Sequence, residues 1–213
     1  MDEFMKQKIK RNFLFWGEMG QKYTLLMIIG AYAYSILELS GDALNMFMMM
    51  AVLASVIVPI TFIQAYFTTV ISLGSGRKET VLGSQLLYVI HIVEFTAATW
   101  LAGFVFPTQR EFITETVYEQ VWLMLGLVGI GQSIAAICLQ NKSKQKTISL
   151  IVLATIAFVG MVGGVLIGSK DFISLIANRT AFQIGLTIGA IVIYAISIVV
   201  FIKCTKHYEA FRA

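Results

Sequence analysis

Six long apolar runs, separated by short polar connections, most constrain how this chain folds. A transmembrane helix needs about 20 apolar residues to cross a hydrocarbon layer of roughly 30 Å. Hydrophobic residues make up 58% of the chain and charged residues only 13%, and the mean hydropathy is +0.80, outside the balance of soluble domains. The sequence therefore predicts an all-α integral membrane protein, a single transmembrane domain over residues 1–213. The six predicted spans are residues 23–39, 43–73, 86–106, 117–139, 148–168 and 182–202.

The second apolar run is too long for a straight span, because as one helix it measures about 46 Å. It contains Pro59, which removes an internal backbone hydrogen bond. We expect a bend at Pro59 and an inner end that protrudes from the bilayer.

Lysines and arginines are divided unequally between the two sides of this topology. If the amino terminus is inside, thirteen of them lie on the inner side and three, Arg110, Lys170 and Arg179, on the outer side. Cytoplasmic loops carry such an excess. We therefore predict a multi-pass protein of the cell membrane with both termini in the cytoplasm. The same asymmetry explains the net charge of +4, so that little supports nucleic-acid binding.

Residues 1–20 are too short and too charged to cross a bilayer. As a helix they place apolar side chains on one stripe and cations on the remaining face. This pattern predicts an amphipathic interfacial helix that lies on anionic membrane lipid, and a frayed basic tail is the alternative. The stripe consists of Met5, Ile9, Phe13 and Trp16.

The last two spans carry glycines at every fourth position, which places them on one helix face. Glycine at this spacing lets two helices approach closely in lipid, although glycine is also common in spans generally. We predict close packing through Gly160, Gly164, Gly168, Gly185 and Gly189. Between these spans, the outer connection 169–181 interleaves apolar and polar residues, and we expect it to dip into the membrane.

The connection between the second and third spans, SLGSGRKETVLGS at residues 72–84, is rich in glycine and charge. It is not a phosphate-binding loop, because Glu79 follows Lys78 where that motif requires serine or threonine, and an apolar helix precedes it. We expect Gly74 and Gly76 to end the second span. Residues 78–85 then restart a short cytoplasmic coupling helix before the third span. A solvated turn is the alternative.

The segment RKETVLGSQLLY, residues 77–88, resembles the segment after the second span in permease subunits of ABC exporters of the second type. The predicted architecture is similar to that family in four respects: an amphipathic first helix, six spans, two inner termini and a partly embedded connection before the last span. The resemblance implies docking of a separate cytosolic ATPase chain, which binds the ATP and Mg, and pairing with a second permease as a homo- or heterodimer. The implied docking residues, over the segment 72–85, are Ser75, Arg77, Lys78, Glu79, Thr80 and Leu82.

Polar residues inside the spans are candidates for a translocation path. His91 and Glu94 are neighbours on one helix face, and a mutual hydrogen bond would offset the cost of an ionisable group in lipid. A purely structural pair is the alternative. Gln64 and Gln132 are further intramembrane polar groups. With one histidine and one glutamate, we predict no metal site, and we predict no catalytic residues.

These features favour a permease subunit of an ATP-driven exporter of hydrophobic or amphipathic substrates, such as a peptide, lipid or antibiotic. The chain itself is expected not to be an enzyme and to bind no cofactor. The alternatives are a six-span substrate-binding subunit of a vitamin uptake transporter and, third, a membrane enzyme or scaffold.

Overall fold

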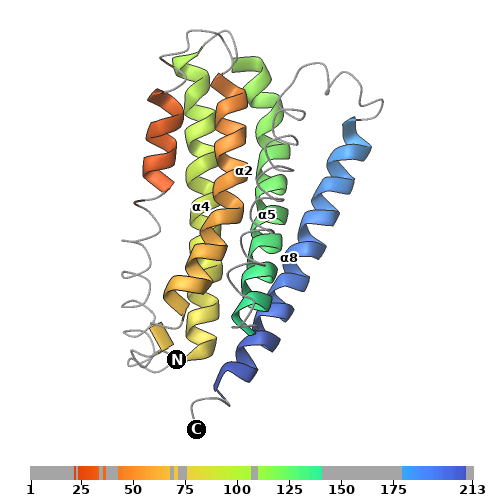
Figure 1. The fold of residues 1–213 in the computed structure, drawn as a ribbon. Helices are drawn as coiled ribbons and strands as arrows, with labels where there is room; N and C mark the ends of the chain where they lie inside the picture. Colours follow the sequence, from red (N-terminus) through yellow and green to blue (C-terminus); the bar gives the residue numbers. More distant parts are fainter. Residues whose placement is uncertain are drawn as a thin grey trace, which may run out of the picture.

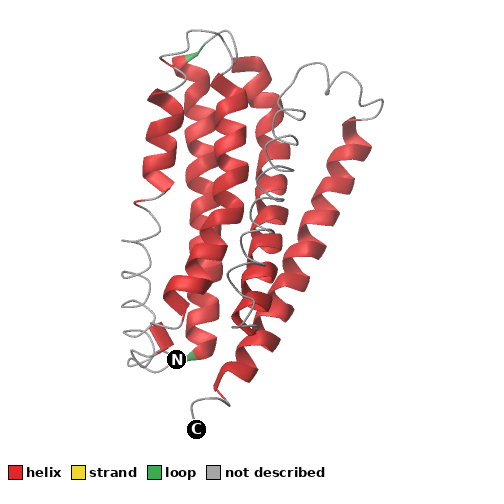
Figure 2. Cartoon of the chain, in the orientation of Figure 1, coloured by secondary structure: helices red, strands yellow, loops and turns green. Residues whose placement is uncertain are grey.

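The computed structural model describes residue 22, residues 24–33, residue 36 and residues 43–67, 70–71, 76–106, 110–140 and 179–209. These residues are helical except for Gly76 and Phe106, and they include no strand (Figure 2). The predicted interfacial helix, the fifth span with its three glycines, residues 169–178 and Ser75 lie outside the described residues.

The described helices form an elongated bundle (Figure 1). In it, α4 (Arg77–Val105) runs opposite to α2 (Ala43–Thr61), α5 (Arg110–Gln140) and α8 (Arg179–Glu209). Three helical stretches are long and apolar enough to cross a membrane, Glu79–Val105, Thr116–Leu139 and Arg179–Thr205, and two shorter apolar helices are Thr24–Ala33 and Met49–Gln64. The helical membrane fold is thus confirmed, whereas the number of six spans stays a prediction. The elements are α2 (Ala43–Thr61), the π-helical turn η1 (Phe62–Phe67), α4 (Arg77–Val105), α5 (Arg110–Gln140) and α8 (Arg179–Glu209).

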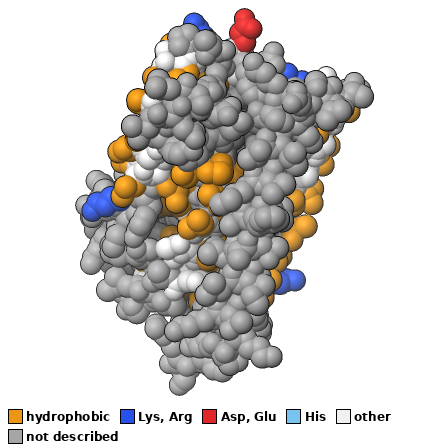
Figure 3. All heavy atoms as spheres, turned by 45° about the horizontal axis from the view of Figure 1, so that its top comes forward, with side chains coloured by type: hydrophobic (Ala, Val, Ile, Leu, Met, Phe, Trp, Pro, Cys, Tyr) orange, Lys and Arg blue, Asp and Glu red, His pale blue; other side chains and the backbone are white. Residues whose placement is uncertain are grey.

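The outside of the bundle is apolar. Large hydrophobic side chains are exposed along α4 and α8, including Val93 and Phe104 on α4 and Ile188 and Ile196 on α8. In Figure 3 such side chains cover the middle of the described surface and charged ones lie toward its edges. This arrangement suits a lipid environment, in which charges are favoured at the helix ends.

Helix α5 is the centre of the bundle, because it packs against α2, α4 and α8. Glycines allow two of these contacts. A Cβ atom on Gly131 would lie 2.8 Å from the carbonyl oxygen of Val56 in α2, and one on Gly129 would lie 3.0 Å from the Cα atom of Tyr194 in α8. Backbones that approach this closely leave no room for a side chain.

We therefore expect Gly131→Ala to destabilise the purified protein by about 1–3 kcal/mol, because the added methyl group overpacks the contact between α5 and α2. The measurement is thermal unfolding in detergent. Gly30→Ala is the matched control, since nothing lies within 4 Å of a Cβ atom there. Equal unfolding temperatures for the two variants would contradict the assigned contact.

The second apolar run contains an irregularity close after Pro59. Pro59 lies inside α2, which continues to Thr61 before the π-helical turn Phe62–Phe67 begins. Proline removes the N–H that would bond the carbonyl of Ser55, and an inserted residue is one way for a helix to absorb such a defect. The regular α-helix is therefore interrupted one turn after Pro59.

The predicted short coupling helix is wrong as a separate element. Residues 77–85 are the first turns of α4, which continues without a break through Gly83 to Val105. Nothing between Lys78 and Leu86 ends a helix, since a single interior glycine only weakens one. At 29 residues α4 measures about 43 Å, so its first turns extend beyond a hydrocarbon layer of roughly 30 Å.

Most of the described part of the predicted first span is the apolar helix Thr24–Ala33, which pairs with α4. Thr24 Oγ1 lies 3.0 Å from His91 Nδ1, and the Tyr32 hydroxyl donates to the Ala98 carbonyl at 2.8 Å, so Thr24–Ala33 runs parallel to α4. His91 lies at the middle of the candidate span Glu79–Val105. Thr24–Ala33 therefore lies beside the half of α4 that ends at Val105.

Candidate functional site

A row of buried polar side chains follows the inner face of α4. Its members recur three, four or eight positions apart, which keeps them on one helix face, and each is at most 2% exposed. At about 1.5 Å per residue the row extends over roughly 28 Å, close to the thickness of a hydrocarbon layer. Thr80, Ser84 and Thr99 donate to carbonyls of their own helix, whereas an ionisable group such as His91 is costly inside a membrane and is a candidate functional residue. The row consists of Thr80, Ser84, Tyr88, His91 and Thr99.

His91 is the central member of this row. Its Nδ1 atom pairs with Thr24, its ring packs edge-on against Phe95 at 5.1 Å, and its Nε2 atom has no hydrogen-bond partner among the described residues. The hydrogen bond predicted between His91 and Glu94 is therefore wrong. The imidazole is buried in the bundle. Glu94, on the same helix, is half-buried, and its carboxylate has no hydrogen-bond partner among the described residues.

The two glutamines predicted for the path lie on other elements. Gln132 of α5 is fully buried, and its Oε1 accepts a hydrogen bond from Ser197 of α8 at 3.3 Å. Its Nε2 has no partner among the described residues. Gln64 is half-buried in η1. The structure thus places His91 and Gln132 inside the bundle, and no hydrogen bond between described residues joins any two of the four predicted path residues.

A polar connection ties the amino-terminal half of α4 to α8. The Tyr194 hydroxyl donates to Gln85 Oε1 at 2.6 Å, and Gln85 Nε2 donates to Ser84 Oγ at 3.2 Å. Together with the pair of Gln132 and Ser197, it links α8 to both neighbouring helices through neutral hydrogen bonds.

A second cluster lies toward the amino-terminal ends of α5 and α8. Glu119 is 5% exposed, and its Oε1 accepts from Arg179 Nε at 3.2 Å and from Gln183 Nε2 at 2.7 Å. On the adjacent face of α5, Gln120 Nε2 donates to Thr99 of α4 at 2.9 Å. This cluster joins three helices through one ion pair and amide hydrogen bonds.

We expect Arg179→Leu to destabilise the protein by about 1–3 kcal/mol, because it leaves the Glu119 carboxylate buried with less compensation. In the double variant Glu119→Leu with Arg179→Leu the loss should be smaller than the sum of the single losses, as measured by thermal unfolding in detergent. Additive losses would show that the ion pair does not couple the two helices.

The proposed docking segment forms the start of α4. The backbone N–H of Gly76 donates to Glu79 Oε2 at 3.1 Å, so Glu79 caps the helix. Arg77 Nη1 donates to the carbonyl of Thr205 in α8 at 3.3 Å. Thr80 is fully buried, and its hydroxyl donates to the Gly76 carbonyl. Its side chain is therefore not available to a docking partner. Leu82, by contrast, is 66% exposed.

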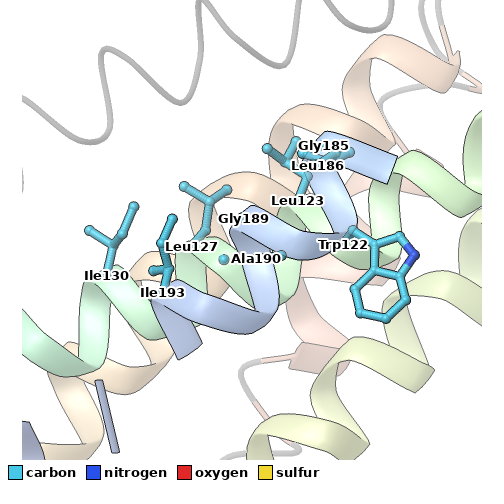
Figure 4. A pocket seen from close by; sticks show the side chains of 10 residues that line it. Trp122, Leu123, Leu127, Ile130, Gly185, Leu186, Gly189, Ala190 and Ile193 are labelled. Atoms are coloured by element: carbon cyan, nitrogen blue, oxygen red, sulfur yellow. The ribbon is translucent and has the colours of Figure 1, made fainter. Parts of the chain in front are cut away.

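An apolar groove of about 240 Å³ separates parts of α5 and α8 (Figure 4). Gly126, Gly185 and Gly189 line it together with leucine and isoleucine side chains from both helices. No atom lies within 4 Å of a Cβ position on Gly185 or Gly189 among the described residues. The predicted partner of these two glycines, the run 148–168, lies outside the described residues.

Several of these residues were not predicted as site residues, although the sequence contains signals for them. Glu119 is an acid inside the predicted span 117–139, and like Glu94 it is a candidate functional residue because ionisable groups are costly in a membrane. Tyr88 shares the helical spacing of Ser84 and His91. The close approaches of Gly129 and Gly131 have no such signal, because these glycines are not four residues apart.

Among the described residues no group of three histidine, cysteine, aspartate or glutamate side chains is arranged to hold a metal ion. The comparisons with known proteins add no family to this description. No protein-family model matches the chain, and neither the curated proteins nor the solved structures yielded a match.

Proposed function

We propose that this chain is a permease subunit of an ATP-driven exporter, in which a separate cytosolic ATPase docks on the start of α4. The observation that carries the proposal is the hydrogen bond from Arg77 to Thr205, which ties the start of α4 to the inner end of α8. If the ATPase displaces the capped first turn of α4, the hydrogen bond therefore transmits this displacement to α8 as well.

The docking surface differs from the one that the resemblance implies. Glu79 caps its own helix and Arg77 bonds to α8, so both side chains stabilise the segment. Exposed Leu82 offers an apolar anchor on the first turns of α4. Apolar anchors supply much of the affinity at interfaces, whereas charges at the rim set register and partner choice.

The interior supports transport more than catalysis. The polar row on α4 runs most of the way through the bundle, and its groups are hydroxyls, an imidazole and neighbouring amides. Such groups line a path for a substrate with both polar and apolar parts. A second permease then completes the path from the other side.

Leu82→Glu should reduce co-purification of the ATPase by about tenfold or more, because a charge replaces the apolar anchor of the interface. The matched control is Val105→Glu, which places the same charge at an exposed position near the outer end of α4. The amount of ATPase recovered with the tagged permease is the measurement. Unchanged capture by Leu82→Glu would contradict the docking assignment.

Accessibility of the same segment provides an independent test of the topology. A cysteine introduced at Leu82 should react with a membrane-impermeant reagent only after the cells are opened, whereas one at Glu111 should react in intact cells. Labelling of residue 82 from outside would contradict the exporter proposal, because no cytosolic ATPase would reach that end of α4.

The vitamin uptake alternative is favoured by one observation, the buried polar cluster of Glu119 and Gln120 toward the outer end of α5. A substrate-binding subunit needs polar groups near its outer face. The partners distinguish the two functions, since an exporter permease brings down another permease and a vitamin subunit brings down a large coupling membrane protein.

A further inference from the structure

Three fully buried polar groups in the middle of the bundle lack partners among the described residues. They are the Nε2 atom of His91, the hydroxyl of Tyr88 and the Nε2 atom of Gln132, and these residues are 2%, 0% and 0% exposed. Leaving a buried polar atom without a hydrogen bond costs free energy, most of all in a region without water. A shared missing partner would satisfy several of them together.

The three groups lie at nearly the same depth. Helices α4 and α5 are antiparallel, and Gln120 of α5 bonds Thr99 of α4. Following both helices inward from this bond places Gln132 level with residue 87 of α4, next to Tyr88 and about 6 Å in depth from His91.

The same hydrophobic core surrounds these groups. Tyr88 belongs to one core cluster with Val128, Ala135 and Ala136, which flank Gln132 on α5. Phe95 of the same cluster packs against the ring of His91, and Phe62 packs edge-on against Tyr88 at 6.0 Å. Polar groups from two helices thus lie within one apolar core in the middle of the membrane.

The chemistry of the three groups limits what satisfies them. Among the unpartnered atoms, Gln132 Nε2 only donates, whereas the Tyr88 hydroxyl and the neutral His91 Nε2 can donate or accept, and none carries a fixed charge. The lysine and arginine side chains that the structure places are exposed or lie at helix ends: Lys22, Arg77, Arg110, Arg179 and Lys203. A phosphate or carboxylate would find no cation at this level, and an ester offers only acceptors. An uncharged amide offers both a C=O and an N–H.

We propose that His91, Tyr88 and Gln132 form a mid-membrane binding site for the uncharged amide groups of an amphipathic peptide. This inference rests on the proposed function for the identity of the cargo, and it selects the peptide from the classes that an exporter of this kind transports. The aromatic side chains Phe62 and Phe95 provide the apolar surroundings in which such hydrogen bonds are strong.

Binding to the purified full chain in detergent, without any ATPase, tests the site. The probe is an N-acyl dipeptide amide that carries a diazirine in its acyl chain. We expect saturable binding, with photolabelling of α4 and α5 near residues 88 and 132. Tyr88→Phe and Gln132→Leu should each weaken binding about tenfold, the effect of one lost hydrogen bond.

The matched control is Thr116→Val, which removes an equally buried hydroxyl from the same helix at a different depth, where Oγ1 already donates to the carbonyl of Ile113. It should leave the Kd unchanged. Because the Tyr88 hydroxyl is unpartnered, Tyr88→Phe should unfold at a temperature equal to or above that of the unsubstituted protein. Gln132→Leu also loses the hydrogen bond from Ser197, so it should unfold at a slightly lower temperature but still in one cooperative transition, which shows that it folds.

Equal Kd values for the unsubstituted chain, Tyr88→Phe and Gln132→Leu would overturn the proposal, as would absence of probe binding. Equally tight binding of the corresponding ester, which lacks the amide N–H, would overturn the choice of amide. Loss of ATPase capture with intact probe binding would contradict the proposed exporter function and would still support the amide-binding site. Absent probe binding with intact ATPase capture would contradict the site alone.

Discussion

The close approach of α5 to its neighbours is the contact on which the rest of the bundle depends. At Gly131 the backbone of α5 meets the carbonyl of Val56, and at Gly129 it meets the backbone of Tyr194. In lipid, helices associate through packing and hydrogen bonds, because the surroundings are as apolar as the side chains. Two glycine contacts on opposite partners therefore hold α2, α5 and α8 in a fixed register.

That register determines which polar groups meet. With Gly129 against Tyr194, Gln132 reaches Ser197, and toward the outer end Glu119 reaches Arg179 and Gln183. A shift of α5 by one turn, about 5.4 Å, would separate these pairs and leave more buried groups unsatisfied. Packing and hydrogen bonding thus specify the same arrangement, as expected for a sequence with one stable fold.

The amino-terminal end of α4 combines rigidity with exposure. Glu79 caps α4, and Arg77 fixes its first turn to the end of α8, while Leu82 remains exposed. At the opposite end of the bundle a partly buried ion pair joins α5 to α8.

The amino-acid sequence by itself determined the helical membrane fold, because apolar runs of this length have no other way to satisfy their backbone groups in lipid. It also identified His91 and Gln132 as polar groups inside the bundle. It did not reveal that His91 pairs with Thr24, that residues 77–85 continue into α4, or that Gly129 and Gly131 make the close contacts. Those facts depend on the relative depth and rotation of helices far apart in the chain. Only the tertiary structure decides them, because a helix with apolar residues on every side does not indicate which side faces its neighbours.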